Sequence, residues 1–121
     1  MAFCTELDGM FAEVAGTPQF VNALRVKLAA DLTVTLDGAA RALGVSSRTL
    51  QRRLHDGDTT FQRELEAERV RAAKRLMLET DAKLDAIARD VGCASGTHLA
   101  ALFRRLENCS PREWRRTEKS R

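Results

Sequence analysis

Apolar residues recur three and four positions apart along the chain, and no segment alternates apolar and polar residues as a strand would. Glycine and proline are sparse, with 7 and 2 residues, and tyrosine is absent. This pattern predicts an all-α protein.

The first apolar stripe ends at Gly16, and Thr17 and Pro18 then supply the cap and first-turn signals of a second helix. The members of the stripe are Phe3, Leu7, Met10, Phe11 and Val14. We therefore expect a boundary near residue 16, with residues 1–16 forming either an N-terminal helix or a remnant of the connection to another domain.

Further helix starts are marked by polar capping residues, which accept hydrogen bonds from the free N–H groups of a first turn. They are Thr35, Ser46 or Ser47, Thr60, Asp81, Ser95 and Ser110. The last is the clearest, because Ser110, Pro111 and Glu113 together form a capping box with proline at the first helical position. Seven helices are predicted after residue 16.

An internal repeat predicts how these helices are grouped. "LDGAARALG" (36–44) matches "LDAIARDVG" (84–92) at an offset of 48 residues. After the glycine the offset grows by one residue, and "SRTLQRRL" (47–54) matches "GTHLAALF" (96–103) at an offset of 49. Each copy reads as a short helix, a turn with glycine and a second helix, which is the helix-turn-helix pattern. The predicted elements of a DNA-binding domain over 17–121 are a first helix-turn-helix at about 35–55, a linker helix at about 60–79, a second helix-turn-helix at about 83–107 and a C-terminal helix at about 111–117.

Positive charge is concentrated outside the first stripe. The chain has a net charge of +3, but residues 1–16 hold three acids and no base, so the remaining 20 basic and 14 acidic residues give 17–121 a net charge of +6. No acid stands between Asp37 and Asp56, where four arginines fall. Such a local excess attracts a polyanion, although a solvated helix face is the alternative.

The second helix of the first copy presents this charge on one face. Leu50 and Leu54 recur four apart and are expected to face inward, which leaves Arg48, Gln51 and Arg52 on the opposite side. Arginine suits bidentate contact with guanine and glutamine with adenine. The face therefore predicts base reading in a DNA major groove.

In these motifs the sequence closely resembles the DNA-binding domain of the AraC/XylS family of bacterial transcription regulators. The resemblance is carried by "AARALGVSSRTLQRRL" (39–54) and "IARDVGCASGTHLAALFRRLENCSPREWRR" (87–116), and it covers residues 18 to 116. It implies a homeodomain-like fold of two helix-turn-helix subdomains bridged by a long helix, with both recognition helices entering successive major grooves.

Base-reading positions of the family carry over to both copies. The expected base contacts are Arg48, Gln51, Arg52, Thr97, Ala100 and Ala101, and the expected phosphate contacts are Thr49, Arg53, His98 and Arg104. The second copy departs from the family because it lacks long polar side chains, and Gly96 with the alanines is expected to let the backbone approach DNA closely. One strongly specified half-site and one tolerant half-site follow from this difference.

Other classes of protein have little support. His55 and His98 are isolated, Asp85 and Asp90 lack the spacing for a shared site, and no phosphate loop or nucleophile elbow occurs, so we expect no enzyme and no cofactor. Cys4, Cys93 and Cys109 form no C-x-x-C pair, which argues against a metal site and for a reduced, cytoplasmic chain. No apolar run approaches the length of about 20 residues that a membrane span needs.

Two single residues have competing interpretations. Cys93 stands where the family usually has phenylalanine and is interpreted as a small core residue rather than a redox sensor. Trp114 follows the capping box and is interpreted as a core anchor for the last helix.

The predicted function is sequence-specific binding of double-stranded DNA that regulates bacterial transcription. The alternative is a helix-turn-helix module that binds protein, with weak or non-specific DNA binding. Expected partners are duplex DNA, RNA polymerase and a sensor or dimerisation domain of the same chain.

Overall fold

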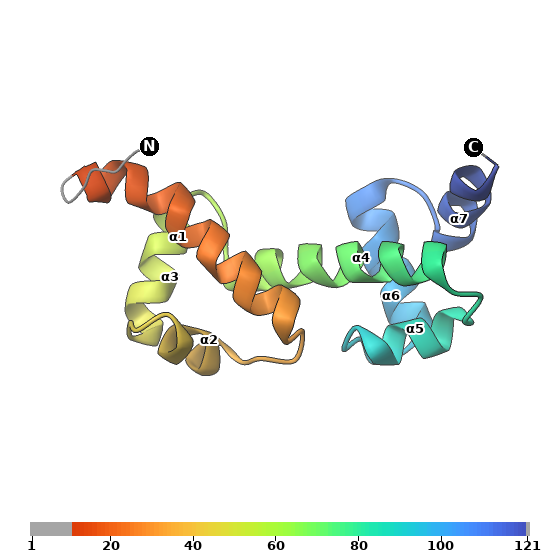
Figure 1. Ribbon diagram of the computed structural model, residues 1–121, viewed down its shortest axis with the longest axis horizontal. Helices are drawn as coiled ribbons and strands as arrows, with labels where there is room; N and C mark the ends of the chain where they lie inside the picture. Colours follow the sequence, from red (N-terminus) through yellow and green to blue (C-terminus); the bar gives the residue numbers. More distant parts are fainter. Residues whose placement is uncertain (1–10, 121) are drawn as a thin grey trace. The chain divides into compact units, whose positions relative to one another are not determined.

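Seven helices make up the part of the chain that the computed structural model describes, which is the backbone of residues 11–120 and the side chains of residues 19–120 (Figure 1). They are α1 (Phe11–Ala30), α2 (Leu36–Ala42), α3 (Ser47–Asp56), α4 (Phe61–Glu79), α5 (Leu84–Asp90), α6 (Gly96–Glu107) and α7 (Pro111–Lys119). No strand occurs among these residues, and the predicted all-α class is confirmed. The chain divides into two compact units, unit 1 ending at Glu64 and unit 2 beginning at Leu65.

Capping residues explain where most of the helices begin. Thr35 accepts a hydrogen bond from the Gly38 N–H at the start of α2, Ser46 accepts one from Thr49 at α3, and Ser95 accepts one from His98 at α6. Thr60 does the same for the Arg63 N–H in the first turn of α4. These starts agree with the predictions because an N-cap is a local interaction that the sequence itself records.

Two predicted helix boundaries are wrong. α1 runs unbroken through Gly16, Thr17 and Pro18. The φ angle that proline fixes is helical, but inside a helix Pro18 removes a hydrogen bond and crowds the preceding turn, at a cost of about 3 kcal/mol. Most of the helix expected over residues 1–16 lies outside the described residues. α5 begins at Leu84 rather than at Asp81, and its N-cap residue Lys83 makes no side-chain capping bond.

Tertiary contacts account for the late start of α5. The guanidinium of Arg115 donates to the carbonyl oxygens of Met77 at 3.1 Å, Ala82 at 3.2 Å and Thr80 at 3.2 Å, and so holds the connection between α4 and α5 in a non-helical path. Lys119 also forms an ion pair with Asp81 at 3.1 Å, but the Asp81 side chain is 97% exposed, so this pair contributes little.

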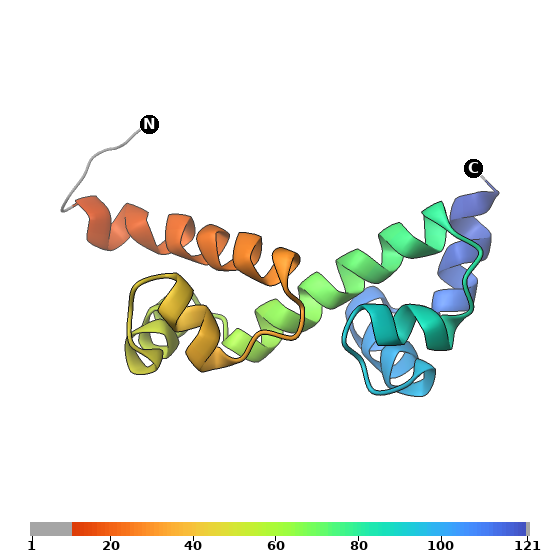
Figure 2. The same cartoon turned by 60° about the horizontal axis from the view of Figure 1, so that its bottom comes forward.

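Unit 1 buries its core between α1 and the helix pair that follows it. α1 packs against both α2 and α3, as Figure 2 shows. The buried apolar residues are Val21, Leu24, Leu28, Ala39, Ala40, Leu50 and Leu54. At its edge the first turn of α4 is attached by Glu64, which accepts hydrogen bonds from Arg25 at 2.7 Å and from Thr59 at 2.6 Å.

Unit 2 repeats this arrangement with α5, α6 and α7, and the greater part of α4 supplies the helix that precedes the pair. Its largest fully buried residues are Met77, Ile87, Val91, Leu99 and Phe103. Trp114 of α7 lies edge to face against Phe103, with ring centroids 5.8 Å apart, and is itself half-buried. Its predicted anchoring role is therefore confirmed, although the ring is not fully enclosed.

The structural repeat includes more of the chain than the repeat found in the sequence. Gly44 and Gly92 take left-handed φ angles of 75° and 84° in the two turns. Asp58 and Asn108, which are 50 residues apart, take φ angles of 60° and 63° just after α3 and α6. Each unit thus consists of a packed helix, a helix-turn-helix, a left-handed residue and a further helix that begins three residues after it.

The capping box of α7 gives a first test of this fold. Ser110 Oγ accepts from the Glu113 N–H at 3.1 Å, and the Ser110 N–H donates to Glu113 Oε1 at 2.9 Å. Removing the cap acceptor in Ser110→Ala is expected to lower the free energy of unfolding by about 1 kcal/mol in a denaturant titration. Thr117→Ala, at an exposed position of the same helix, is the control and should change it by less than about 0.5 kcal/mol.

The same box sets a pH dependence. Hydrogen bonds from Ser110 lower the pKa of Glu113 from its ordinary value. A lowered carboxyl pKa stabilises the folded state above the unfolded pKa, and this contribution is lost as pH falls through the folded pKa. Ser110→Ala should therefore move the pKa of Glu113 upward in an NMR titration, and an unchanged pKa would show that the serine side chain contributes nothing to it.

Candidate nucleic-acid interface

The face of α3 predicted to read bases is exposed in the structure. Leu50 and Leu54 have no exposed surface and fasten the helix to the core of unit 1. Arg48, Gln51 and Arg52 are all exposed on the side that these leucines do not occupy. The structure thus brings together the three long polar side chains expected to face DNA.

Two aspartates that sequence reasoning did not assign fix the start of each recognition helix. The Ser47 hydroxyl donates to the carboxylate of Asp37 in unit 1. The Gly96 N–H donates to Asp85 Oδ1 at 2.9 Å in unit 2. The signal was present, because a Leu-Asp pair opens both copies of the repeat at residues 36–37 and 84–85.

Gly96 requires a correction. It was expected to let the backbone approach DNA, but it is buried, and a Cβ built on it would lie 2.3 Å from Asp85 Oδ1. The glycine therefore makes room for the contact between α5 and α6 and does not face outward.

The remaining predicted residues of α6 differ in exposure. Thr97, Ala101 and Arg104 are exposed, whereas Ala100 is half-buried and offers less surface to a ligand. His98 is exposed, and its Nδ1 accepts a hydrogen bond from the Ala94 N–H at 3.2 Å. Only its other ring nitrogen is then left for a further contact.

The two residues of α3 that are predicted to contact phosphates each interact with another residue of unit 1. The Thr49 hydroxyl is half-buried and accepts from Ser46 Oγ at 3.0 Å. The guanidinium carbon of Arg53 lies 4.9 Å from the ring centroid of Phe20 on α1, so that this exposed arginine also connects α3 to α1. Such cation–π contacts are worth about 0.5 to 1 kcal/mol at exposed sites.

Cys93 is a buried core residue, as expected. Burial raises the pKa of its thiol, with a smaller opposing effect of Arg69, so the neutral thiol is favoured over the reactive thiolate. Among the described residues, no group of three His, Cys, Asp or Glu side chains is placed to hold a metal ion. None of the helices over residues 11–120 combines the length and apolar character of a membrane span.

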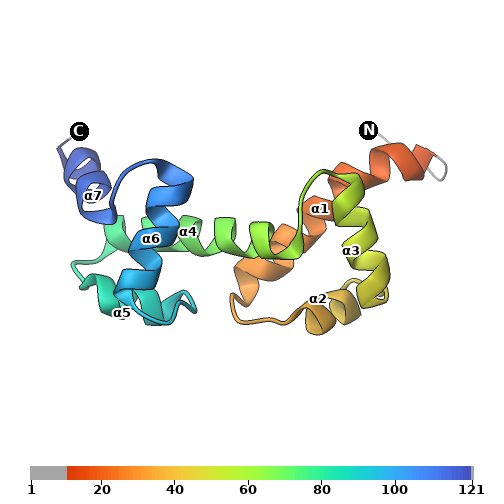
Figure 3. The same cartoon turned by 180° about the vertical axis from the view of Figure 1, so that it is seen from behind.

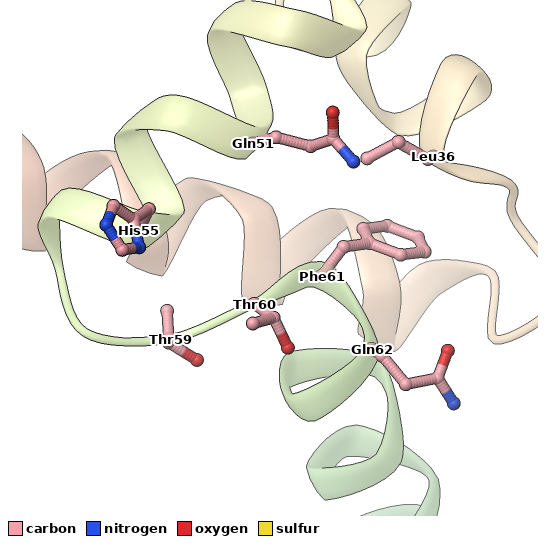
Figure 4. Close-up of a pocket in the computed structure, with 7 residues that line it drawn as sticks. All are labelled: Leu36, Gln51, His55, Thr59, Thr60, Phe61 and Gln62. Atoms are coloured by element: carbon pink, nitrogen blue, oxygen red, sulfur yellow. The ribbon is translucent and has the colours of Figure 1, made fainter.

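A pocket of about 330 Å³ opens beside the reading face of α3. Gln51 and His55 of α3 border it, and Figure 4 shows the Gln51 amide directed toward Leu36 of α2, with the Phe61 ring beneath them. Thr59, Thr60 and Gln62 complete its lining. The start of α4 therefore lies next to the face that is expected to meet DNA.

The fold and these faces define a protein with two helix-turn-helix motifs. Each has a capped, exposed recognition helix, α3 and α6, and both are seen in Figure 3. Comparison with known families shows that the helix-turn-helix domain family matches residues 39–117. The chain belongs to this family and is a DNA-binding domain of the AraC/XylS type, as found in transcription regulators.

Relatives and solved structures agree with this assignment. The chain is 36% identical over 83 residues to the HTH-type transcriptional activator RhaS of Escherichia coli O139:H28. The matched region covers 68% of this chain and 30% of the relative. It is similar to the C-terminal domain of AraT, a response regulator from Geobacillus stearothermophilus, at 27% identity and a TM-score of 0.69 over 80% of this chain and 84% of that one. A DNA-binding transcriptional dual regulator from Escherichia coli K-12 shares the fold, with a TM-score of 0.78 at 19% identity over 84% of this chain and 93% of that one.

Proposed function

We propose that the chain binds double-stranded DNA in a sequence-specific manner and thereby regulates bacterial transcription. The observation that carries the proposal is the face of α3, where Arg48, Gln51 and Arg52 are exposed above two fully buried leucines. Arginine and glutamine side chains can each form bidentate hydrogen bonds with base edges in the major groove. We assign the main sequence readout to this helix.

The second helix, α6, is proposed to enter the next major groove and to contribute less specificity. Thr97 offers one hydroxyl and Ala101 only a methyl group, which suits contact with a thymine methyl. Arg104 and His98 are proposed to contact phosphates, which positions a protein without reading the sequence. The family resemblance and the repeated helix-turn-helix support this arrangement.

Partners beyond DNA are proposed from the relatives. The chain spans about 30% of the length of the curated relative RhaS, which is named a transcriptional activator. We propose contact with RNA polymerase and cooperation with a sensor or dimerisation domain in the same polypeptide.

Selection of binding sites from a random duplex pool tests the proposal directly. The expected result is a site with one strongly specified half and one tolerant half about one helical turn, or 10 base pairs, away. Affinity for the selected duplex should fall steeply with salt, because each neutralised phosphate contributes about −0.9 to the slope of log K against log salt concentration. Failure to enrich any sequence, together with a flat salt dependence, would favour the alternative of a protein-binding module, which the small side chains of α6 permit.

A further inference from the structure

A basic groove lies in unit 2 between the start of α5 and the start of α7. Its volume is about 540 Å³, and its lining residues are Lys83, Leu84, Pro111, Arg112 and Arg115. Three of these five side chains are cationic, and none is acidic. We define these five residues as the α5–α7 groove.

The cations of the α5–α7 groove are not neutralised by carboxylates. Lys83 and Arg112 are exposed, and within residues 19–120 neither side chain makes an ion pair or a hydrogen bond. Arg115 donates its N–H groups to three backbone carbonyl oxygens, and within residues 19–120 it makes no ion pair with an acid. Converging positive charges without counter-charges attract an anion.

The nearby acids are engaged elsewhere. Asp81 pairs with Lys119, Glu113 accepts from the Ser110 N–H, and Asp85 accepts from the Gly96 N–H. None of these three acids lines the groove, so the charged side chains that line it are all positive.

The repeat relates the α5–α7 groove to the pocket beside α3. Leu36 of that pocket corresponds to Leu84 at an offset of 48, and Phe61 and Gln62 correspond to Pro111 and Arg112 at an offset of 50. In unit 1 the equivalent pocket borders Gln51, which belongs to the face expected to read bases.

The repeat also relates residues of α6 to the two residues of α3 that border the pocket of unit 1. The positions that correspond to Gln51 and His55 are Ala100 and Arg104, at an offset of 49. Arg104 helps to lower the pKa of Glu113, which places its charge near the first turn of α7. By this correspondence the groove is expected on the side of unit 2 where α6 carries Ala100 and Arg104, although no residue of α6 lines it.

From this placement we infer that the α5–α7 groove binds the DNA backbone, with Lys83 and Arg112 contacting phosphates on the strand that borders the major groove entered by α6. The inference rests on the proposed function and extends it to residues outside the recognition helices. It also explains a difference between the two units. α6 lacks the long base-reading side chains of α3, and unit 2 would instead bind through contacts of Lys83 and Arg112 with DNA phosphates. In unit 1, Gln62 stands where unit 2 has Arg112.

The test compares the full chain with a Lys83→Gln/Arg112→Gln double variant on the duplex selected by the wild-type protein. The double variant should bind roughly 10-fold more weakly, and its salt slope should be smaller by about two units, one for each lost phosphate contact. Its base preference should be unchanged, since phosphate contacts carry no sequence information. The matched control is Arg75→Gln, an exposed arginine of α4 that does not line the groove, and it should keep the wild-type slope.

A second measurement locates the contact on DNA. Neutral methylphosphonates are placed singly along the strand that flanks the tolerant half-site. One or two of them should weaken wild-type binding but not binding by the double variant. Circular dichroism melting of both proteins confirms that the variant is folded.

The outcomes separate the two proposals. A folded double variant with wild-type affinity and salt slope overturns the inference and leaves the groove to another anion, such as an acidic protein segment, while the proposed function stands. An equal loss in Arg75→Gln also overturns it, because general charge would then explain the effect. A wild-type chain that selects no duplex overturns the proposed function itself.

Discussion

Phe103→Ala is expected to lower the free energy of unfolding of unit 2 by about 3 to 5 kcal/mol, the usual cost of deleting a buried aromatic ring. Phe103 has no exposed surface and is the largest of the fully buried side chains. Because it lies on α6 and contacts the Trp114 ring of α7, its loss leaves a cavity between two helices.

Part of this loss comes from the aromatic pair. The rings of Phe103 and Trp114 meet at an interplanar angle of 66°, a geometry worth about 0.5 to 1.5 kcal/mol beyond the buried area. Lys74 Nζ of α4 lies 5.7 Å from the Trp114 ring centroid, so the indole has contacts with both α4 and α6. Loss of Phe103 is therefore expected to loosen α7 as well as α6.

The measurement uses a natural probe. Trp114 is the single tryptophan of the chain, so its fluorescence in a denaturant titration reports on unit 2. Leu106→Ala is the matched control, because Leu106 lies on the same helix with 40% of its surface exposed and should cost less than about 1 kcal/mol. Equal losses in the two variants would mean that the aromatic contact does not organise unit 2.

Features that depend on neighbours in the sequence were predictable. Ser46, Ser95 and Ser110 cap their helices because an N-cap bond joins residues three apart. The exposed face of α3 followed equally from the spacing of Leu50 and Leu54. Both inferences needed no knowledge of the tertiary structure.

Features that depend on tertiary partners were missed or misread. Asp85 meets Gly96 eleven residues away, and the repeated Leu-Asp pair marks the aspartate but not its partner. Arg115 meets carbonyl oxygens 33 to 38 residues away, and no sequence pattern marks that contact. The mistaken role of Gly96 followed from this, since an exposed and a buried glycine look alike in a sequence. The late start of α5 has the same origin, because Arg115 of α7 donates to three carbonyl oxygens of the preceding connection.

Arg52→Ala is expected to relax base preference in the strongly specified half-site. A bidentate arginine–guanine pair contributes about 1 to 3 kcal/mol of discrimination, so preference at one base position should fall by about 5- to 150-fold. Arg52 is exposed on α3 and is not among the buried residues that attach the helix, so the effect should appear in specificity and not in folding. Repeating the selection with the variant, and measuring affinities for single-base changes, reads out the loss.

Two arginine variants serve as controls for this division of labour. Arg53→Ala removes the neighbouring side chain, which lies over Phe20, and should lower stability or overall affinity without changing base preference. Arg104→Ala should weaken binding to all sequences alike and reduce the salt slope by about one unit, as expected of a phosphate contact on α6. A selected site with equal information in both halves, or an Arg52→Ala protein whose base preference matches the wild type, would falsify the assignment of sequence reading to α3, because that helix carries the only long polar readers predicted for either motif.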